Sequence, residues 1–185
     1  MSDINGRIAE RLRALRHARG WSLDAAARET GVSKAMLGQI ERGESSPTVA
    51  TLWKIAAGFH TSFSGLLEDA PADGGVLLRS SRGADWPSDE GGIQVRALFP
   101  FDPVLGIEFL VVELAPGACH QSVPHDRGVT EHVIPLNGSL EVCVDGQWQN
   151  VASGEGLRFA ADRPHAYRNG GSAPLLFHNL IHYRG

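Results

Sequence analysis

The sequence predicts a two-domain protein in which an all-α N-terminal domain precedes an all-β domain. Between Ile4 and Leu67 apolar residues recur at helical spacing, as Ile8, Leu12 and Leu15 do. Further along, short alternating or β-branched runs such as IQVRALF and GIEFLVVEL are separated by NG, DG and NGG turns. The stretch EDAPADGG between the two patterns has no periodicity and is typical of a linker. We therefore expect domains at residues 4–69 and 76–185, joined by a linker at 70–75.

Five short helices are expected in the N-terminal domain. Ser22 and Ser33 can cap the second and third helices, because a serine hydroxyl at that position accepts a hydrogen bond from a backbone amide of the first turn. Proline suits the first position of a helix, so Ser46 followed by Pro47 predicts the start of the fourth. The fifth is expected around residues 63–67. Glycines close or separate these helices, at positions 20, 31, 43 and 58.

The second and third helices, within LDAAARETGVSKAMLGQIERG, fit a helix-turn-helix. With Leu37 and Ile40 facing inward, the opposite face of the third helix is left for the major groove of DNA. Gln39 can form paired hydrogen bonds with adenine, and Lys34 can reach guanine or a phosphate. Serines at helix starts offer free backbone amides to phosphates. The candidate DNA-binding residues are Ser22, Ser33, Lys34, Ala35, Gly38, Gln39, Arg42 and Thr48.

Periodicity alone would also allow a plain helical bundle, but four motifs favour a DNA reader. They are LRALR at residues 12–16, the GVS turn, IERG at the end of the third helix, and SPT followed by LWKIA. With these motifs the segment resembles the xenobiotic-response-element (Cro/lambda-repressor-like) helix-turn-helix family. The resemblance implies sequence-specific binding to a double-stranded DNA operator. Gly38 departs from the family pattern, in which a polar residue is more usual.

Many short strands with regular turns predict an antiparallel sandwich or barrel for the second domain, with a hairpin at Asp145-Gly146. Two stretches, APGACHQSVPHDRGVTEHVIPLNG and SGEGLRFAADRPHAYRN, resemble the two motifs of the cupin family. That resemblance implies a cupin (double-stranded β-helix, jelly-roll) barrel, in whose metal-binding members three histidines and a glutamate hold a divalent ion. By the family's spacing, the matching ligands are His125, Glu131 and His165.

The family's second histidine falls on Arg127 in this sequence. Arginine stays protonated and has no lone pair for a metal, whereas it pairs well with a carboxylate, either Glu131 or an acidic ligand. His120 or His132 could replace the missing histidine. His120 is the better substitute, because His132 neighbours Glu131 on a strand and should point to the opposite face. The candidate effector-binding residues are accordingly Arg127, Glu131 and His165.

These features predict a transcriptional regulator whose cupin domain binds a small-molecule effector or a divalent transition metal. A homodimer is expected, because one reader of this size makes too few base contacts for specific affinity. Two alternatives are a DNA-binding protein whose cupin only dimerises, and a metal-dependent cupin enzyme. We expect no enzyme, because an arginine stands in a ligand position and a DNA reader is attached.

Charge and cysteine content agree with this reading. Residues 1–69 carry nine Lys and Arg against eight Asp and Glu, a net charge of +1, and residues 70–185 carry eight against thirteen, a net of −5. Only the first part can approach a polyanion without strong repulsion. Two cysteines without a CxxC pair, no signal-peptide pattern and no long apolar stretch predict a cytoplasmic protein with no membrane partner.

Overall fold

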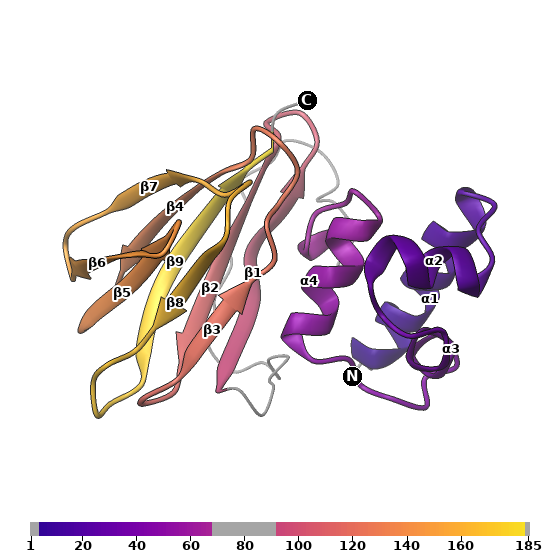
Figure 1. Cartoon of the computed structure of the whole chain (residues 1–185), viewed down its shortest axis with the longest axis horizontal. Coiled ribbons are helices and arrows are strands. Elements are labelled where there is room, and N and C mark those ends of the chain that lie inside the picture. The colour runs from indigo at the N-terminus through magenta and orange to yellow at the C-terminus, as the bar shows by residue number, and fades with distance from the viewer. Residues whose placement is uncertain (1–3, 68–91, 184–185) are drawn as a thin grey trace. The chain divides into compact units, whose positions relative to one another are not determined.

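The computed structural model describes residues 4–67 and 92–183 and divides the chain into two compact units, Met1–Asp69 and Ala70–Gly185 (Figure 1). The expected linker at residues 70–75 and the expected start of the second domain at residue 76 lie outside the described residues. Those boundaries therefore stay predictions. The division into a helical and a β-sheet unit confirms the two-domain fold class.

Within the described residues the N-terminal unit contains four α-helices, α1 Ile4–Ala18, α2 Leu23–Thr30, α3 Lys34–Glu41 and α4 Val49–Gly58. The two expected serine caps are confirmed. Ser22 Oγ accepts a hydrogen bond from the backbone amide of Ala25 at 3.1 Å, and Ser33 Oγ accepts one from Met36 at 3.2 Å. Gly31 joins α2 to α3 with a φ of 66°, a conformation that residues with a side chain rarely adopt.

The prediction of a fifth α-helix was wrong. The segment contains only the 3-10 helix η1, Ser64–Leu66, held by backbone hydrogen bonds from Leu66 to Phe63 and from Leu67 to Ser64. A bond of this i to i+3 type closes a tighter turn than an α-helix, and such turns rarely extend beyond a few residues. Phe63 and Leu66 are fully buried, so the short turn serves to place both in the core.

The fourth helix also begins later than expected. Its N-cap is Thr48, whose hydroxyl accepts a hydrogen bond from the amide of Thr51 at 3.1 Å, so Pro47 lies just outside the helix. Gly58 is the last residue of α4 rather than a residue beyond its end. A Cβ at Gly58 would lie 2.6 Å from the carbonyl oxygen of Glu29, so this glycine allows α4 to pass close to α2.

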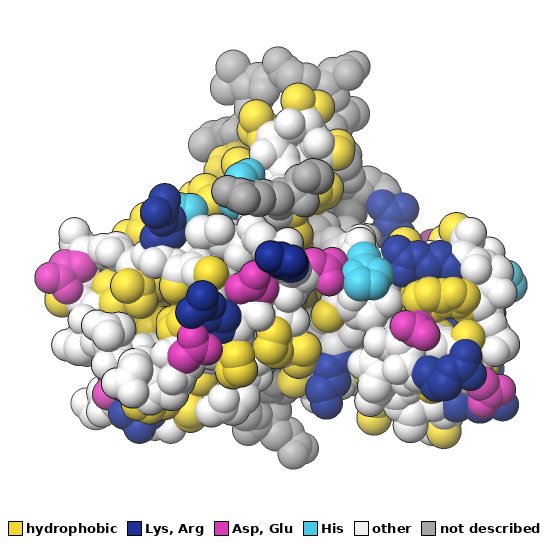
Figure 2. Space-filling view, turned by 45° about the horizontal axis from the view of Figure 1, so that its top comes forward, with side chains coloured by type: hydrophobic (Ala, Val, Ile, Leu, Met, Phe, Trp, Pro, Cys, Tyr) yellow, Lys and Arg dark blue, Asp and Glu magenta, His cyan; other side chains and the backbone are white. Residues whose placement is uncertain are grey.

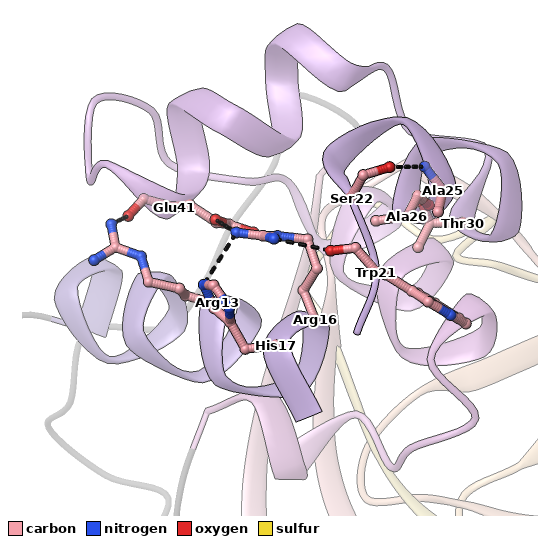
Figure 3. A network of polar contacts seen from close by, with 9 residues as sticks. All are labelled: Arg13, Arg16, His17, Trp21, Ser22, Ala25, Ala26, Thr30 and Glu41. Atoms are coloured by element: carbon pink, nitrogen blue, oxygen red, sulfur yellow. Dashed lines mark hydrogen bonds and ion pairs between the residues drawn. The ribbon is translucent and has the colours of Figure 1, made fainter. Parts of the chain in front are cut away.

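The carboxylate of Glu41 anchors the end of α3 to α1 (Figure 3). Arg16 donates to both oxygens of Glu41, from Nε at 2.6 Å and from Nη2 at 2.7 Å, and its Nη1 also donates to the carbonyl of Trp21 at 3.0 Å. Arg13 donates to the backbone carbonyl of Glu41 at 2.6 Å. The Glu41 side chain is only 7% exposed, so this network fixes the end of α3 against α1.

The C-terminal unit is a sandwich of two antiparallel sheets (Figure 1). The first has the strand order β1-β2-β9-β4-β7 and the second the order β3-β8-β5-β6. Asp145 and Gly146 form the expected hairpin turn between β5 and β6, both with positive φ, as a type I′ turn requires. The strands are β1 Ile93–Asp102, β2 Ile107–Leu114, β3 Cys119–Ser122, β4 Thr130–Pro135, β5 Ser139–Val144, β6 Gln147–Ala152, β7 Leu157–Ala160, β8 His165–Arg168 and β9 Leu175–His182.

Alternate residues of the central strands face the interior between the two sheets. Along β9 every second residue is buried, and the buried positions are Leu175, Phe177, Asn179 and Ile181. Most of the interior is apolar, as in any sandwich core. A small set of polar side chains is nevertheless buried at one end of β4, β8 and β9, and these residues form the site described next.

Candidate functional site

Two histidines and a glutamate come together in the interior of the β unit. Glu131 lies on β4, His165 begins β8 in the other sheet, and His125 belongs to the loop between β3 and β4. His125 Nε2 lies 2.7 Å from Glu131 Oε1, and His165 Nε2 lies 3.4 Å from the same oxygen. The three side chains are 8%, 2% and 0% exposed for His125, Glu131 and His165. Both imidazoles therefore face one buried carboxylate oxygen.

The orientation of His165 suits a metal ligand. Its Nδ1 lies 2.8 Å from the carbonyl oxygen of Arg163, which can only accept, so Nδ1 carries the proton in the neutral ring. The lone pair then lies on Nε2, the atom that faces Glu131. This buried Nε2 makes only a long contact, 3.4 Å, with Glu131 Oε1. A backbone carbonyl that fixes the tautomer of a histidine in this way is common beside metal sites.

The second oxygen of Glu131 is held by two residues that the sequence analysis did not single out. The hydroxyl of Tyr167 donates to Glu131 Oε2, and Asn179 Nδ2 donates to the same atom at 2.8 Å. Tyr167 lies on β8 and Asn179 on β9, and both are at most 4% exposed. One signal in the sequence was available for Tyr167, since it follows His165 at i+2 on a strand and therefore shares its face.

The electrostatics of the cluster favour an ionised carboxylate. Burial alone would raise the pKa of Glu131, but hydrogen bonding and charge from His125 and His165 outweigh it and hold that pKa far below the usual range. Burial lowers the pKa of His165, whereas Glu131 and the Arg163 carbonyl raise it, with a net rise. Burial and the charge of Glu131 raise the pKa of Tyr167 well above its usual value, so its phenol stays protonated and donates.

The donor set fits a divalent transition metal. The donor atoms of His125, Glu131 and His165 all lie within 4.8 Å of one another. Ligands bound at about 2.1 Å around one such ion lie roughly 3–4 Å apart, so small side-chain movements suffice. Two imidazoles and one carboxylate are a donor set typical of iron and related metals, and they leave coordination positions open. A bound ion would also accept the lone pair of His165 Nε2.

In the helical unit, the exposed side of α3 forms the candidate DNA-reading face, which we define as Ala35, Met36, Gln39 and Arg42. These four residues are exposed, whereas Leu37 and Ile40 on the opposite side are buried. The short turn at Gly31 places α2 and α3 against each other, as a helix-turn-helix requires. A recognition helix supported in this way can enter the major groove.

The chain matches two known families in the same order. A helix-turn-helix family model matches residues 12–66, and a cupin-domain model matches residues 110–181. The chain is 47% identical over 183 residues to the HTH-type transcriptional regulator SutR of Escherichia coli (strain K12), covering 99% of this chain and 98% of the relative. This protein is a helix-turn-helix transcriptional regulator with a C-terminal cupin domain. The resemblances inferred from the motifs are thereby confirmed.

Two solved structures resemble the regulator closely. A transcriptional regulator of the HTH_3 family from Vibrio cholerae is 42% identical, covers 98% of both chains and has a TM-score of 0.83. The cupin domain of an XRE family transcriptional regulator from Enterobacter cloacae is 47% identical, with a TM-score of 0.50, and spans 51% of this chain and 99% of that one. Among the described residues, no helix is long and apolar enough to cross a membrane.

Two cupin residues that the sequence analysis weighed lie outside the cluster. Arg127 is exposed on the loop that carries His125, so its guanidinium does not take the place of a buried metal ligand. His120 is buried and pairs in register with Tyr167 across β3 and β8, so it faces the same interior. Within the described part of the chain, however, His120 does not belong to the group of donors that could share one ion.

The candidate DNA-binding residues of the regulator differ in their surroundings. Ser22, Ser33 and Thr48 are N-caps whose side-chain oxygens already accept backbone amides. Gly38 is buried, and a Cβ there would lie 3.1 Å from Arg42 Nη1 and 3.7 Å from Leu23 Cδ1 in α2, so the backbone of this glycine is covered by neighbouring side chains. Exposed Met36, which the sequence analysis overlooked, does belong to the reading face because it is 41% exposed and precedes Gln39 by three residues.

Lys34 and Arg42, the two basic side chains among the candidate DNA-binding residues, already have acidic partners. Lys34 Nζ lies 2.8 Å from Asp24 Oδ2, and Arg42 Nη2 lies 2.7 Å from Glu44 Oε2. In the view of Figure 2 basic and acidic side chains are likewise intermixed rather than gathered by sign. All four side chains are more than half exposed, and exposed ion pairs are weak, so DNA phosphates can displace these carboxylates.

Proposed function

We propose that the regulator reads an operator through the exposed face of α3, and that a divalent transition metal at His125, Glu131 and His165 modulates this binding. One observation carries the proposal: two buried imidazoles face one oxygen of a buried carboxylate, in a chain that also holds a DNA reader. Two imidazoles and one carboxylate that converge in this way form a donor set typical of transition-metal sites.

A small acidic effector is the ligand that we propose for the open metal positions. Three protein donors leave at least one position free on a transition metal, and a carboxylate binds such an ion well. Arg127 supports this proposal from the outer end of the same loop, because an exposed guanidinium can pair with an acidic group that approaches from solvent. In this proposal the bound metal is part of a sensor and does not catalyse a reaction. The regulator acts in the cytoplasm.

The decisive experiment compares operator affinity of metal-free and metal-loaded regulator. Short DNA duplexes selected from a random library supply the operator, and fluorescence anisotropy measures its Kd. We expect a change of about fivefold or more between the two states, the usual range of coupling between two sites. Random duplex serves as the control, because a metal effect on charge alone would change both affinities equally. Identical operator affinities in the two states would contradict metal sensing.

We further propose that two copies of the regulator read two half-sites of one operator. Exposed apolar side chains on the outer side of the larger sheet offer a surface for a second copy, because Ile134 and Leu136 near β4 are 43% and 46% exposed and Phe99 on β1 is 39% exposed. Exposed apolar side chains on one face of a sheet can form part of an interface. A dimer also supplies the second set of base contacts that specific affinity requires.

Replacing Gln39 by alanine is expected to relax specificity at one base pair in each half-site. The glutamine amide can make two hydrogen bonds to adenine, worth about 1–3 kcal/mol of discrimination. Operator variants carrying each base at every position, measured by competition, locate the affected pair. Met36→Ala on the same face is the matched control, since it removes no hydrogen bond. A uniform loss across all sequences would identify Gln39 as a backbone contact, and an effect in one half only would contradict the dimer.

A further inference from the structure

We propose that Tyr167 and Asn179 hold Glu131 as a one-oxygen ligand and thereby determine the affinity and selectivity of the metal site. The inference rests on the proposed metal site and concerns two residues outside the donor set. Both are buried at 4% exposure or less, and both donate to Oε2 of Glu131, the oxygen that faces away from the histidines.

The two donors use the hydrogen-bonding capacity of Oε2. A carboxylate oxygen has two lone-pair sites, and Oε2 accepts from the Tyr167 hydroxyl and from Asn179 Nδ2. Oε1 remains for the other side, where His125 Nε2 lies at 2.7 Å and His165 Nε2 at 3.4 Å. A metal in the cluster therefore has one carboxylate oxygen to bind.

The fold holds these donors firmly. Asn179 lies on β9, which pairs with β4 beside Glu131, and Tyr167 reaches the carboxylate from β8 in the facing sheet. The Tyr167 ring also packs against Phe177, with 5.3 Å between ring centroids. Glu131 is therefore held from both sheets, and its carboxylate cannot rotate without breaking two buried hydrogen bonds.

One-oxygen binding has a consequence for metal choice. Calcium prefers six to eight oxygen ligands, often including a carboxylate that binds through both oxygens. A single carboxylate oxygen with two imidazoles suits smaller transition ions. Tyr167 and Asn179 therefore disfavour calcium by occupying the oxygen that it would need. They also fix the Glu131 side chain before a transition metal binds. Less conformational entropy is then lost on binding, which favours a higher metal affinity.

The test is a Co²⁺ titration of the full-length protein, with a chromophoric chelator as competitor. Tyr167→Phe is expected to weaken Co²⁺ binding by about 10–100-fold, as is usual for partners that orient a metal ligand. The ratio of Co²⁺ to Ca²⁺ affinity should fall with it, because Oε2 becomes available. Tyr183→Phe is the matched control. It removes another tyrosine–glutamate hydrogen bond, to buried Glu108, and should leave both affinities unchanged.

Asn179→Leu provides a second variant with a similar volume and no donor, and circular dichroism establishes that each variant folds. It should reproduce the loss of Co²⁺ affinity even if Tyr167→Phe fails to fold. If the folded variants bound Co²⁺ as tightly as the wild type does, the positioning role would be overturned. The proposed metal site would then still stand. Failure of the wild type to bind Co²⁺ would overturn both the positioning role and the proposed metal site.

Discussion

Replacing Glu41 by glutamine is expected to lower the free energy of unfolding of the helix-turn-helix domain by about 3 kcal/mol. The Glu41 and Arg16 side chains are 7% and 14% exposed and share two short hydrogen bonds. Glutamine removes the negative charge and turns an N–H group toward the guanidinium. Arg16 is then left largely buried without a counter-ion, which costs more than the loss of a surface pair.

Urea unfolding followed by tryptophan fluorescence measures this loss, because the indole of Trp21 packs 5.0 Å from the ring of Phe59 and loses this environment when the domain unfolds. The matched control is Glu44→Gln. Glu44 also pairs with an arginine, but both partners are more than half exposed, so we expect a change below about 1 kcal/mol. Operator affinity should fall in Glu41→Gln as the end of α3 loses its anchor. Similar stabilities for the two variants would show that the Glu41 network contributes little.

Replacing Glu131 by glutamine is expected to abolish stoichiometric metal binding. The donors Tyr167 and Asn179 require an acceptor, so the amide oxygen of glutamine takes the place of Oε2. The amide nitrogen then faces His125 and His165, and it has no lone pair for an ion. The substitution thus removes both the charge and the ligand atom. We expect the metal affinity to fall by more than about 100-fold, beyond the usual effect of losing an orienting partner.

Elemental analysis of protein purified without a chelator measures this outcome, together with the rise in Tm on adding Co²⁺, which the variant should lose. Glu108→Gln is the control, because it also neutralises a fully buried glutamate that a tyrosine hydroxyl contacts. The control should retain metal. A stoichiometric metal in Glu131→Gln would place the ligands elsewhere in the chain and remove the basis of the proposed sensor.

Local signals in the sequence were sufficient for much of the fold. Helix caps at Ser22 and Ser33 and the hairpin turn at Asp145-Gly146 depend on neighbouring residues, so their prediction needed no knowledge of the fold. The predicted start of the fourth helix was wrong because Ser46 and Thr48 lie two residues apart and either can cap a helix. In the structure the hydroxyl of Thr48, and not that of Ser46, accepts the amide of the first turn. The expected fifth helix contracted to a single 3-10 turn.

The residues of the candidate sites could likewise be predicted only in part. Motif spacing pointed to His125, Glu131 and His165, which the structure brings together, and to Arg127, which it leaves exposed on a loop. Burial of Gly38 beside Arg42 and Leu23 likewise depends on side-chain packing rather than on helical period alone. Periodicity states which residues share a face, but not which of them a neighbouring element covers.

The sequence by itself determined that a helical DNA reader precedes an antiparallel β-sandwich or barrel, because the periodicity and motifs along one chain carry that information. The three metal-ligand candidates followed from the resemblance of two of its stretches to the cupin motifs. Only the tertiary structure decided how Glu131 is held. Tyr167 and Asn179 lie 36 and 48 residues away from it, on strands of different sheets. Their contact with one carboxylate oxygen depends on strand register and on the distance between two packed sheets, which no local pattern specifies.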